Sequence, residues 1–149
     1  MKTKGIPADT PNPPEKAHRQ PLTRSEMMSR VKCKDTGPEK RVRSLLHALG
    51  YRFRLHRRDL PGSPDIVLPT RKVAIFVHGC FWHGHGCKRG GCLPKTNAAF
   101  WAKKLADNLA RDARNRSALE NIGWKVLVVW ECELKNEETL TNLLCSFLD

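Results

Sequence analysis

Residues 78–87 carry a density of reactive side chains that neither a core strand nor an ordinary surface loop needs. The segment reads His-Gly-Cys-Phe-Trp-His-Gly-His-Gly-Cys, so it holds three histidines, two cysteines and two large aromatic residues. Cys80, His85 and Cys87 are ligand types that zinc prefers, and their spacing allows them to fill three corners of a tetrahedral site. Three ligands in so short a segment imply a fourth ligand from elsewhere in the chain.

The fourth ligand has two candidates. Cys132 follows the apolar run 124–130, which reads as a buried strand whose end could meet the loop. Cys92 is the rival, because it lies shortly after the segment. Four protein ligands would make the metal structural, and His78 and His83 would then be available for acid-base chemistry near neutral pH. The alternative is a set of buried or unpaired thiols without a metal.

The chain is strongly basic for its length. Its 149 residues include 27 lysines and arginines against 15 aspartates and glutamates, a formal net charge of +12. A charge of this size favours a polyanionic partner, and nucleic acid is the first candidate. No basic amphipathic helix with an apolar face is evident in the sequence, so attachment to an acidic membrane is not favoured. A simply soluble basic protein is the alternative.

The expected cellular compartment decides whether the cysteines form disulfides or bind metal. The sequence has no run of eighteen apolar residues and no hydrophobic stretch near its start, so we expect neither a membrane span nor a signal peptide. We therefore expect a cytoplasmic protein. In that reducing compartment, six cysteines near histidines indicate metal binding rather than disulfides.

The first 22 residues differ in composition from the rest of the chain. Half of the ten prolines fall in the first 21 residues, among polar and charged neighbours. This composition predicts a flexible, basic and proline-rich N-terminal tail over residues 1–22. Thr23 and Glu26 have the spacing of a capping box, which should open a short helix. We expect residues 23–149 to form a single domain.

The remaining sequence alternates helices and short strands. Apolar spacing and terminal signals predict a helix between Pro38 and Gly50, a long helix from about Asn97 to Asn121, and a helix near the C-terminus. Strands are predicted at four places: 51–55, 65–68, 72–77 and 124–130. We therefore expect an α/β fold with a central mixed β-sheet flanked by helices.

One motif refines this expected fold. Pro64 and Asp65 open a predicted strand, and the next strand leads into the segment 78–87. The arrangement resembles the PD-(D/E)xK nucleases, whose restriction-endonuclease-like fold places carboxylates around Mg²⁺. The usual acid and lysine of the second strand are missing, and Val77-His78-Gly79 occupies their place.

Four separated motifs narrow the resemblance. They are PGxPD at 61–65, HGCFWHxHxC at 78–87, FW at 100–101 and GWxVLxVWEC at 123–132. Together they resemble the very-short-patch repair (Vsr) endonucleases over about Thr23 to Leu134. The resemblance implies an enzyme that nicks one DNA strand beside the thymine of a T:G mismatch, which arises when 5-methylcytosine deaminates.

The resemblance implies a catalytic Mg²⁺ in addition to the structural Zn²⁺. Asp65 and the main-chain carbonyl of Val77 would hold the Mg²⁺, and Glu39 would reach it through water. Local sequence alone allows simpler roles for these acids. Asp65 after a proline could cap a turn, and Glu39 in the first turn of a helix could only favour the helix dipole.

The same resemblance assigns the histidines. His83 would be the general base, held in its tautomer by Asp112 on the long helix, and His78 would contact the phosphate or the leaving group. Taken singly, Asp112 could be a surface partner of Arg116, and His78 could be a buried histidine with a structural role. Their joint occurrence in one family pattern favours the catalytic interpretation.

Aromatic residues would recognise the mismatch. Phe81 and Trp82 lie at the crest of the metal-bound loop and Trp101 heads the long helix, so all three could wedge between base pairs. Packing in the core is the alternative for each of them. Met28 matches the family's N-terminal element, which clamps the opposite groove. Contacts to DNA phosphates are predicted for five basic residues of the long helix: Lys103, Lys104, Arg111, Arg114 and Arg116.

The resemblance also implies the partners of the protein. They are double-stranded DNA with a T:G mismatch and, as a further candidate, mismatch-repair proteins. The resemblance also implies that the protein acts as a monomer in a bacterial cytoplasm, in association with the nucleoid.

Two other functions stay open. One is a related nuclease with a different or broader specificity, because catalytic residues do not encode the flanking bases. The other is a catalytically silent, zinc-stabilised DNA-binding module, for which the missing acid and lysine would be natural.

Overall fold

The computed structural model describes residues 21–149, apart from the side chains of Arg24, Ser25 and Met28. The described residues divide into two compact units, one that ends at Val31 and one that begins at Lys32. Within residues 21–149, no helix combines the length and the apolar character that a membrane span requires.

Helix α1 (Arg24–Ser29), in the first unit, begins at the predicted capping box. Oε2 of Glu26 accepts hydrogen bonds from the N–H and the hydroxyl of Thr23 at 2.7 and 2.9 Å, and the N–H of Glu26 donates to Thr23 Oγ1 at 3.3 Å. These bonds satisfy N–H groups at the helix start, so the capping box is confirmed. Met28, a predicted DNA contact, belongs to α1, and its side chain lies outside the described residues.

The second unit is built on a four-stranded sheet in the order β1-β2-β3-β4. The strands are β1 (Arg54–Leu55), β2 (Ile66–Leu68), β3 (Val73–His78) and β4 (Lys125–Trp130). Strands β1, β2 and β3 pair antiparallel, whereas β4 pairs parallel to β3 with Trp130 opposite His78. The sheet is therefore mixed, as the sequence predicts.

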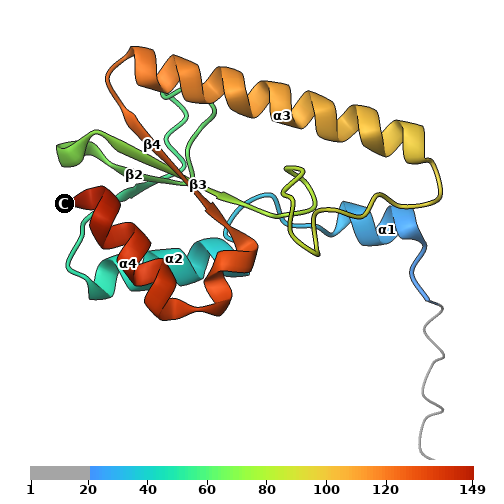
Figure 1. Ribbon diagram of the computed structural model, residues 1–149, viewed down its shortest axis with the longest axis horizontal. Helices are drawn as coiled ribbons and strands as arrows, with labels where there is room; N and C mark the ends of the chain where they lie inside the picture. Colours follow the sequence, from blue (N-terminus) through green and yellow to red (C-terminus); the bar gives the residue numbers. More distant parts are fainter. Residues whose placement is uncertain (1–20) are drawn as a thin grey trace, which may run out of the picture. The chain divides into compact units, whose positions relative to one another are not determined.

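Helices cover both faces of this sheet (Figure 1). Helices α2 (Gly37–Ala48) and α4 (Glu137–Leu148) lie against one face, and the long helix α3 (Ala98–Asn121) runs along the other. A short 3-10 helix, η1 (Pro69–Arg71), joins β2 to β3, and a second, η2 (Glu131–Lys135), joins β4 to α4. The mixed sheet between helical layers confirms the predicted α/β fold class.

The main core lies between the sheet and the pair α2 and α4. Alternate strand residues point to this face, because successive side chains in a strand point to opposite sides. The buried strand residues on this face are Ile66, Leu68, Val73, Ile75, Leu127 and Val129. They pack against buried residues of the two helices, which are Val42, Leu46, Leu140, Leu144 and Leu148. This core fixes the ends of β2 and β3, where the site is built.

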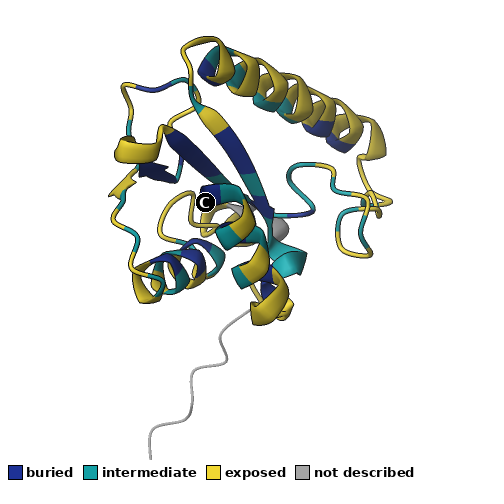
Figure 2. Ribbon diagram, turned by 60° about the vertical axis from the view of Figure 1, so that its left-hand side comes forward, coloured by how far each residue is buried: buried dark blue, intermediate teal, exposed yellow. Residues whose placement is uncertain are grey.

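Helix α3 packs on the sheet mainly through its C-terminal part. Leu119 is fully buried against Val67, Ala74 and Val126 on the second face of the sheet. Most of the helix surface is exposed, as Figure 2 shows. The N-terminal part of α3 therefore stands beside the loop that follows β3 rather than over the sheet core.

Two sequence predictions differ from the structure in detail. The strand predicted at 51–55 is reduced to the two residues of β1, while Tyr51 and Phe53 pack against the core without strand pairing. Phe100 and Leu109 continue the apolar pattern of α3 but are 59% and 48% exposed. A helix of 24 residues extends well past a sheet of short strands, so part of its apolar face has no sheet to cover.

Candidate functional site: two clusters at the end of strand β3

Asp65 lies directly before β2, and its carboxylate reaches across to β3. Oδ2 accepts a hydrogen bond from the N–H of Val77 at 2.8 Å. In a strand, the N–H and C=O of one residue point to the same edge, so the carbonyl of Val77 faces the space beside the Asp65 carboxylate. Pairing of β2 with β3 begins at Ile66 and Ile75, so β2 does not fill this space.

The Asp65 carboxyl group titrates far from its ordinary range. Burial raises the pKa of Asp65 to about 6, against the opposing effect of the hydrogen bond from Val77. Nearby Glu39 raises this pKa further, and His56 and Arg43 lower it. A divalent cation would offset both the burial and the repulsion between carboxylates. The oxygen donors therefore fit a hard cation such as Mg²⁺.

Glu39 lies in the first turn of α2 and is only 3% exposed. Its N–H donates to the hydroxyl oxygen of the N-cap residue Thr36 at 3.4 Å, and its Oε1 lies 3.0 Å from the same hydroxyl. Its Oε2 accepts from the N–H of Asp35 at 3.0 Å and from Arg43 at 2.9 Å. The carboxylate is buried, and it lies close enough to Asp65 to raise the pKa of that carboxyl group.

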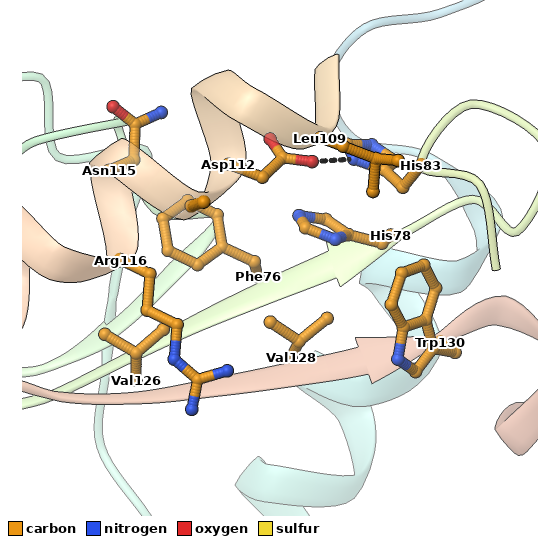
Figure 3. A pocket seen from close by; sticks show the side chains of 11 residues that line it. Phe76, His78, His83, Leu109, Asp112, Asn115, Arg116, Val126, Val128 and Trp130 are labelled. Atoms are coloured by element: carbon orange, nitrogen blue, oxygen red, sulfur yellow. Dashed lines mark hydrogen bonds and ion pairs between the residues drawn. The ribbon is translucent and has the colours of Figure 1, made fainter. Parts of the chain in front are cut away.

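His83, in the loop after β3, is joined to α3 through Asp112 (Figure 3). Nδ1 of His83 lies 2.6 Å from Oδ2 of Asp112. A carboxylate only accepts, so Nδ1 donates and Nε2 of a neutral His83 keeps a free lone pair. The ring of His78 stacks on the ring of His83 with centroids 3.7 Å apart and 5° between the planes. A strand, a loop and a helix thus bring these three residues together.

A pocket of about 250 Å³ opens beside this histidine pair, between α3 and the second face of the sheet (Figure 3). Its apolar lining comes from Phe76, Leu109, Ala113, Val126, Val128 and Trp130. The apolar wall removes water from one side of His78, and burial lowers the pKa of His78 to about 4, with a further contribution from His83. His78 is therefore neutral near pH 7.

Cys80, His85, Cys87 and Cys132 offer four ligand atoms that all lie within 4.8 Å of one another. Sγ of Cys132 lies 3.5 Å from Nδ1 of His85. Burial raises the pKa of the Cys87 thiol, but hydrogen bonds led by that from the Gly90 N–H outweigh it and lower this pKa to about 6. The cluster could hold a metal ion, and three sulfurs with one imidazole form a donor set typical of structural zinc.

The fourth ligand atom comes from Cys132 in η2, directly after β4. Cys92, the rival in the sequence, is exposed and does not belong to the cluster. Gly90 allows the loop to fold back on itself, because a Cβ there would lie 2.0 Å from the carbonyl oxygen of His85 and 2.6 Å from that of Cys80. Any side chain at this position would displace the loop that carries the ligands.

Trp130 connects the two clusters, although its strand pattern suggests a core residue. Its indole ring stacks on His85 of the Cys/His cluster at 4.2 Å and 11°. The same ring meets His78 edge-on at 5.3 Å and 74°. Because β4 pairs parallel to β3 with Trp130 opposite His78, both side chains lie on the same face. Sequence reasoning missed this residue, since the register of β4 is not visible in the sequence.

The three aromatic residues predicted to contact DNA form one group. Phe81, Trp82 and Trp101 have ring centroids 5.2 to 5.8 Å apart in tilted or edge-on contacts. The side-chain amide of Asn108 on α3 donates to the carbonyl of Trp82 at 2.9 Å and ties the loop to the helix. Trp101 is only 9% exposed, whereas its neighbour Phe100 is 59% exposed.

Comparison with known proteins identifies the family of the chain. Residues 17–89 match the family model described as DNA mismatch endonuclease Vsr. The chain is 56% identical over 129 residues to the type II nicking enzyme V.XorIIP of Xanthomonas oryzae pv. oryzae, covering 87% of this chain and 94% of that protein. It is 45% identical over 120 residues to the DNA mismatch endonuclease Vsr of Escherichia coli (strain K12), covering 80% of this chain and 76% of that protein.

Solved structures give an independent comparison of the fold. The catalytic domain of the homing endonuclease I-Bth0305I aligns with a TM-score of 0.54 at 22% identity, over 75% of this chain and 93% of that chain. At this identity the likeness concerns the fold alone. The sequence identities to V.XorIIP and to the Escherichia coli protein extend over most of each chain. The protein therefore belongs to the Vsr family of DNA mismatch endonucleases.

Proposed function

We propose that the protein nicks one strand of duplex DNA beside the thymine of a T:G mismatch, by Mg²⁺-dependent hydrolysis of a phosphodiester bond. One observation carries this proposal. Two consecutive residues at the end of β3 hold the two halves of a hydrolytic site: Val77 binds the Asp65 carboxylate, and His78 stacks on His83, which is bonded to Asp112. A buried carboxylate and an oriented imidazole are the groups that such a hydrolysis needs.

The cation would be held by the Asp65 carboxylate and the carbonyl of Val77, with Glu39 acting through water. When bound, Mg²⁺ would activate water and stabilise the charge that develops on the phosphate. The side chain of Val77 has no part in this role. A different residue at this position would serve as well, provided that the strand keeps its path.

His83 would act as the general base. Its Nδ1–H donates to Asp112, so Nε2 is available to take a proton from the attacking water. The Asp112 carboxylate then faces the imidazolium and stabilises it, much as the aspartate of a Ser-His-Asp triad does. His78, neutral because burial lowers its pKa to about 4, would donate a hydrogen bond to the phosphate or the leaving oxygen.

The aromatic group would recognise the mismatch by insertion. Phe81 and Trp82 are half-buried in contact with each other and with Trp101, so insertion between base pairs would exchange their mutual contacts for stacking on bases. Unstacking a base step costs a few kcal/mol, and less at a weak mispair, which favours insertion there. Met28 in α1 is proposed to contact the opposite groove.

Zinc is proposed as the metal of the Cys/His cluster. The cluster fixes the two ends of the loop 80–87 and joins them to Cys132 after β4, so the aromatic residues within it would be presented on a rigid base. The proposed catalytic and structural sites all lie in one chain, which favours action as a monomer. Lysines and arginines of α3 would contact phosphates without reading sequence.

A related nuclease with another sequence context is the second candidate. It is favoured by the relative V.XorIIP, which is named a type II nicking enzyme rather than a mismatch endonuclease. The proposed catalytic groups serve either function, because they act on the phosphate and not on the flanking bases. Only the preferred duplex differs between the two candidates.

The test compares end-labelled duplexes that carry T:G or C:G in a panel of flanking sequences, with Mg²⁺ or with EDTA. The proposal expects a Mg²⁺-dependent nick on the thymine strand of T:G duplexes, and its loss in Asp65→Ala. Nicking of fully paired duplexes at a defined sequence would favour the second candidate. Binding of T:G duplexes without a nick in every context would overturn the enzyme assignment and leave a silent DNA-binding module.

A further inference from the structure

Arg43 has no assigned role in the proposed hydrolysis, yet its guanidinium lies beside the buried Glu39. One terminal nitrogen lies 2.9 Å from Oε2 of Glu39, and the other lies 2.6 Å from Oδ1 of Asp35. The Arg43 side chain is 14% exposed and the Glu39 side chain 4% exposed. A carboxylate so far removed from water needs a nearby counter-charge, and Arg43 supplies it.

His56 extends this network to the proposed metal ligand. The nitrogen of Arg43 that binds Glu39 also lies 3.0 Å from Nε2 of His56. The same Nε2 of His56 lies 3.5 Å from Oδ1 of Asp35, so His56 contacts both partners of the Arg43 ion pairs with Asp35 and Glu39. The backbone N–H of His56 donates to the carbonyl of Asp65 at 3.2 Å. A continuous set of contacts therefore runs from α2 through Arg43 and His56 to Asp65.

These contacts restrict what Glu39 can still bind. A carboxylate has about four lone-pair positions. On Oε2, one accepts from the N–H of Asp35 and one from Arg43, and on Oε1 one accepts from the hydroxyl of Thr36. Among the described residues this leaves one position, on Oε1, for the water of a hydrated cation. The network thus fixes the orientation of the Glu39 carboxylate and leaves one lone pair of Oε1 to accept a further hydrogen bond.

The same residues do not form a second metal site. Asp35, Glu39 and His56 have ligand atoms within 4.8 Å of one another. The guanidinium of Arg43 stands among these atoms, at 2.6 Å from Asp35, 2.9 Å from Glu39 and 3.0 Å from His56. A permanent cation already occupies the space between the two acids, so a metal ion there would meet the positive charge of the guanidinium at close range.

We propose that Arg43 is a positioning residue, which holds the Glu39 carboxylate in a fixed orientation so that its Oε1 orients the hydration shell of the divalent cation at Asp65. The proposal rests on the proposed function of the site. Arginine suits this role because its planar fork binds two acids at once, whereas a lysine ammonium is a single point charge. Loss of a residue that orients a metal ligand typically costs about 10–100-fold in metal affinity or activity.

The test uses Arg43→Lys, which keeps the charge and removes the fork. The matched control is Arg41→Lys on the same helix, because Arg41 pairs with Glu137 at 3.5 Å on the exposed side, away from Asp65. For each protein, Mn²⁺ binding is titrated by electron paramagnetic resonance, and the Mg²⁺ dependence of single-turnover nicking is measured. We expect Arg43→Lys to weaken both about 10–100-fold, with unchanged affinity for the mismatched duplex, and Arg41→Lys to match the wild type.

A double-mutant cycle separates this role from a general structural one. If Arg43 acts through Glu39, then Arg43→Lys should have no further effect on Mn²⁺ binding in a Glu39→Gln background. An undiminished effect in that background, or an Arg43→Lys protein with wild-type Mn²⁺ affinity, would overturn the inference. A loss of duplex affinity in Arg43→Lys, with a smaller salt dependence, would show a phosphate contact instead.

The same experiment keeps this inference distinct from the proposed function. If the wild type binds Mn²⁺ but nicks no duplex, the proposed function is wrong, while the Mn²⁺ titrations still test the role of Arg43. A wild-type protein that binds no Mn²⁺ would overturn the inference directly. The inference is supported if the wild type nicks, Arg43→Lys lowers the Mn²⁺ affinity in the wild-type background, and Arg43→Lys has no effect on that affinity in the Glu39→Gln background.

Discussion

The rings of His78 and His83 lie parallel with their centroids 3.7 Å apart, although one residue ends a strand and the other lies in a loop. Two imidazoles at this distance repel each other when both are charged. Burial and then the proximity of His83 lower the pKa of His78 to about 4, whereas Nδ1 of His83 faces the Asp112 carboxylate. A proton taken from water would therefore reside on His83, and His78 would stay a neutral donor.

Asp112→Asn should lower the nicking rate by about 10²–10⁴-fold, the range that general acid-base catalysis contributes. The amide can donate to Nδ1 of His83 and thereby favour the wrong tautomer, with the proton on Nε2. Single-turnover nicking of a T:G duplex measures the rate. Affinity for the duplex, measured in EDTA, should stay within about threefold of the wild type, because Asp112 has no proposed contact to DNA.

The matched control for that substitution is Asp107→Asn. Asp107 lies on the same helix and pairs with Lys103 at 3.4 Å, where both side chains are exposed. An exposed pair of this kind contributes about 0–1 kcal/mol, so the control should fold and nick as the wild type does. Equal nicking rates of Asp112→Asn and Asp107→Asn would show that His83 is not the general base.

The contribution of Asp65 to the stability of the metal-free protein, taken as the difference in Tm between the wild type and Asp65→Asn, should be lost as the pH rises from about 4 to about 6. The comparison with the variant is needed because His78, whose pKa burial lowers to about 4, changes the stability in the opposite direction over the same range. Burial raises the pKa of Asp65 to about 6 in the folded state, above the value of about 3.9 in an unfolded chain. The folded state thus holds this proton more tightly, so the contribution to stability is complete below about pH 4 and is lost as the pH passes about 6. Mg²⁺ binds the ionised carboxylate, so the increase in Tm caused by Mg²⁺ should grow over the same range.

Thermal unfolding between pH 4 and pH 8, with and without Mg²⁺, measures this dependence. In Asp65→Asn the carboxylate is absent, so the effect of Mg²⁺ on Tm should be small at every pH. The wild type should differ from this variant most above about pH 6, where Asp65 is ionised. A Mg²⁺ effect of wild-type size in Asp65→Asn would place the cation at other residues.

Cys132→Ser should release the metal of the Cys/His cluster, whereas Cys92→Ser should retain it. Cys132 contributes one of the four ligand atoms within 4.8 Å of one another, and Cys92 is exposed outside that group. Removing a ligand should cost more than the roughly 10–100-fold loss of affinity that follows from altering a residue that only orients a ligand. Elemental analysis of the purified proteins gives the metal content. Metal loss from Cys92→Ser alone would reverse the assignment of the fourth ligand.

Trp82→Ala should weaken binding to a T:G duplex by about 1–3 kcal/mol, the value of stacking one base on an aromatic ring. Because Trp82 is half-buried at the loop and not in the core, its loss should change Tm less than that of Trp101, which is 9% exposed. Ile122→Ala removes an apolar residue that is 54% exposed, directly after the C-terminal end of α3 and away from the loop, and serves as the control. Equal duplex affinity of the wild type and Trp82→Ala would exclude insertion by Trp82.

Elements with local signals were predictable from the sequence within a few residues. Helix α2 begins near Pro38 with Thr36 as its cap, and α3 stops before Gly123, whose φ of +82° suits glycine. The pattern of apolar residues also predicts the mixed sheet. The predicted strand 51–55 is longer than β1, because Tyr51 and Phe53 are partly buried by packing on the core and do not pair with β2.

Contacts that depend on tertiary register were not predictable. Trp130 reads as a core strand residue, and only the parallel pairing of β4 with β3 shows that its ring lies between His85 and His78. Arg43 and Glu39 have the spacing of an ordinary ion pair on a helix surface. Their burial, and the approach of His56 from a distant turn, become visible only in the folded chain.

A cation held by Asp65 is tested most directly by single-turnover nicking of a T:G duplex as a function of Mg²⁺ concentration, for the wild type and for the isosteric variant Asp65→Asn. We predict a Mg²⁺-dependent nick on the thymine strand by the wild type, and no nick at any Mg²⁺ concentration by the variant, while both proteins bind the duplex in EDTA. Equal nicking by the two proteins, or nicking by the wild type in EDTA, would contradict a cation held by Asp65 at the end of β3.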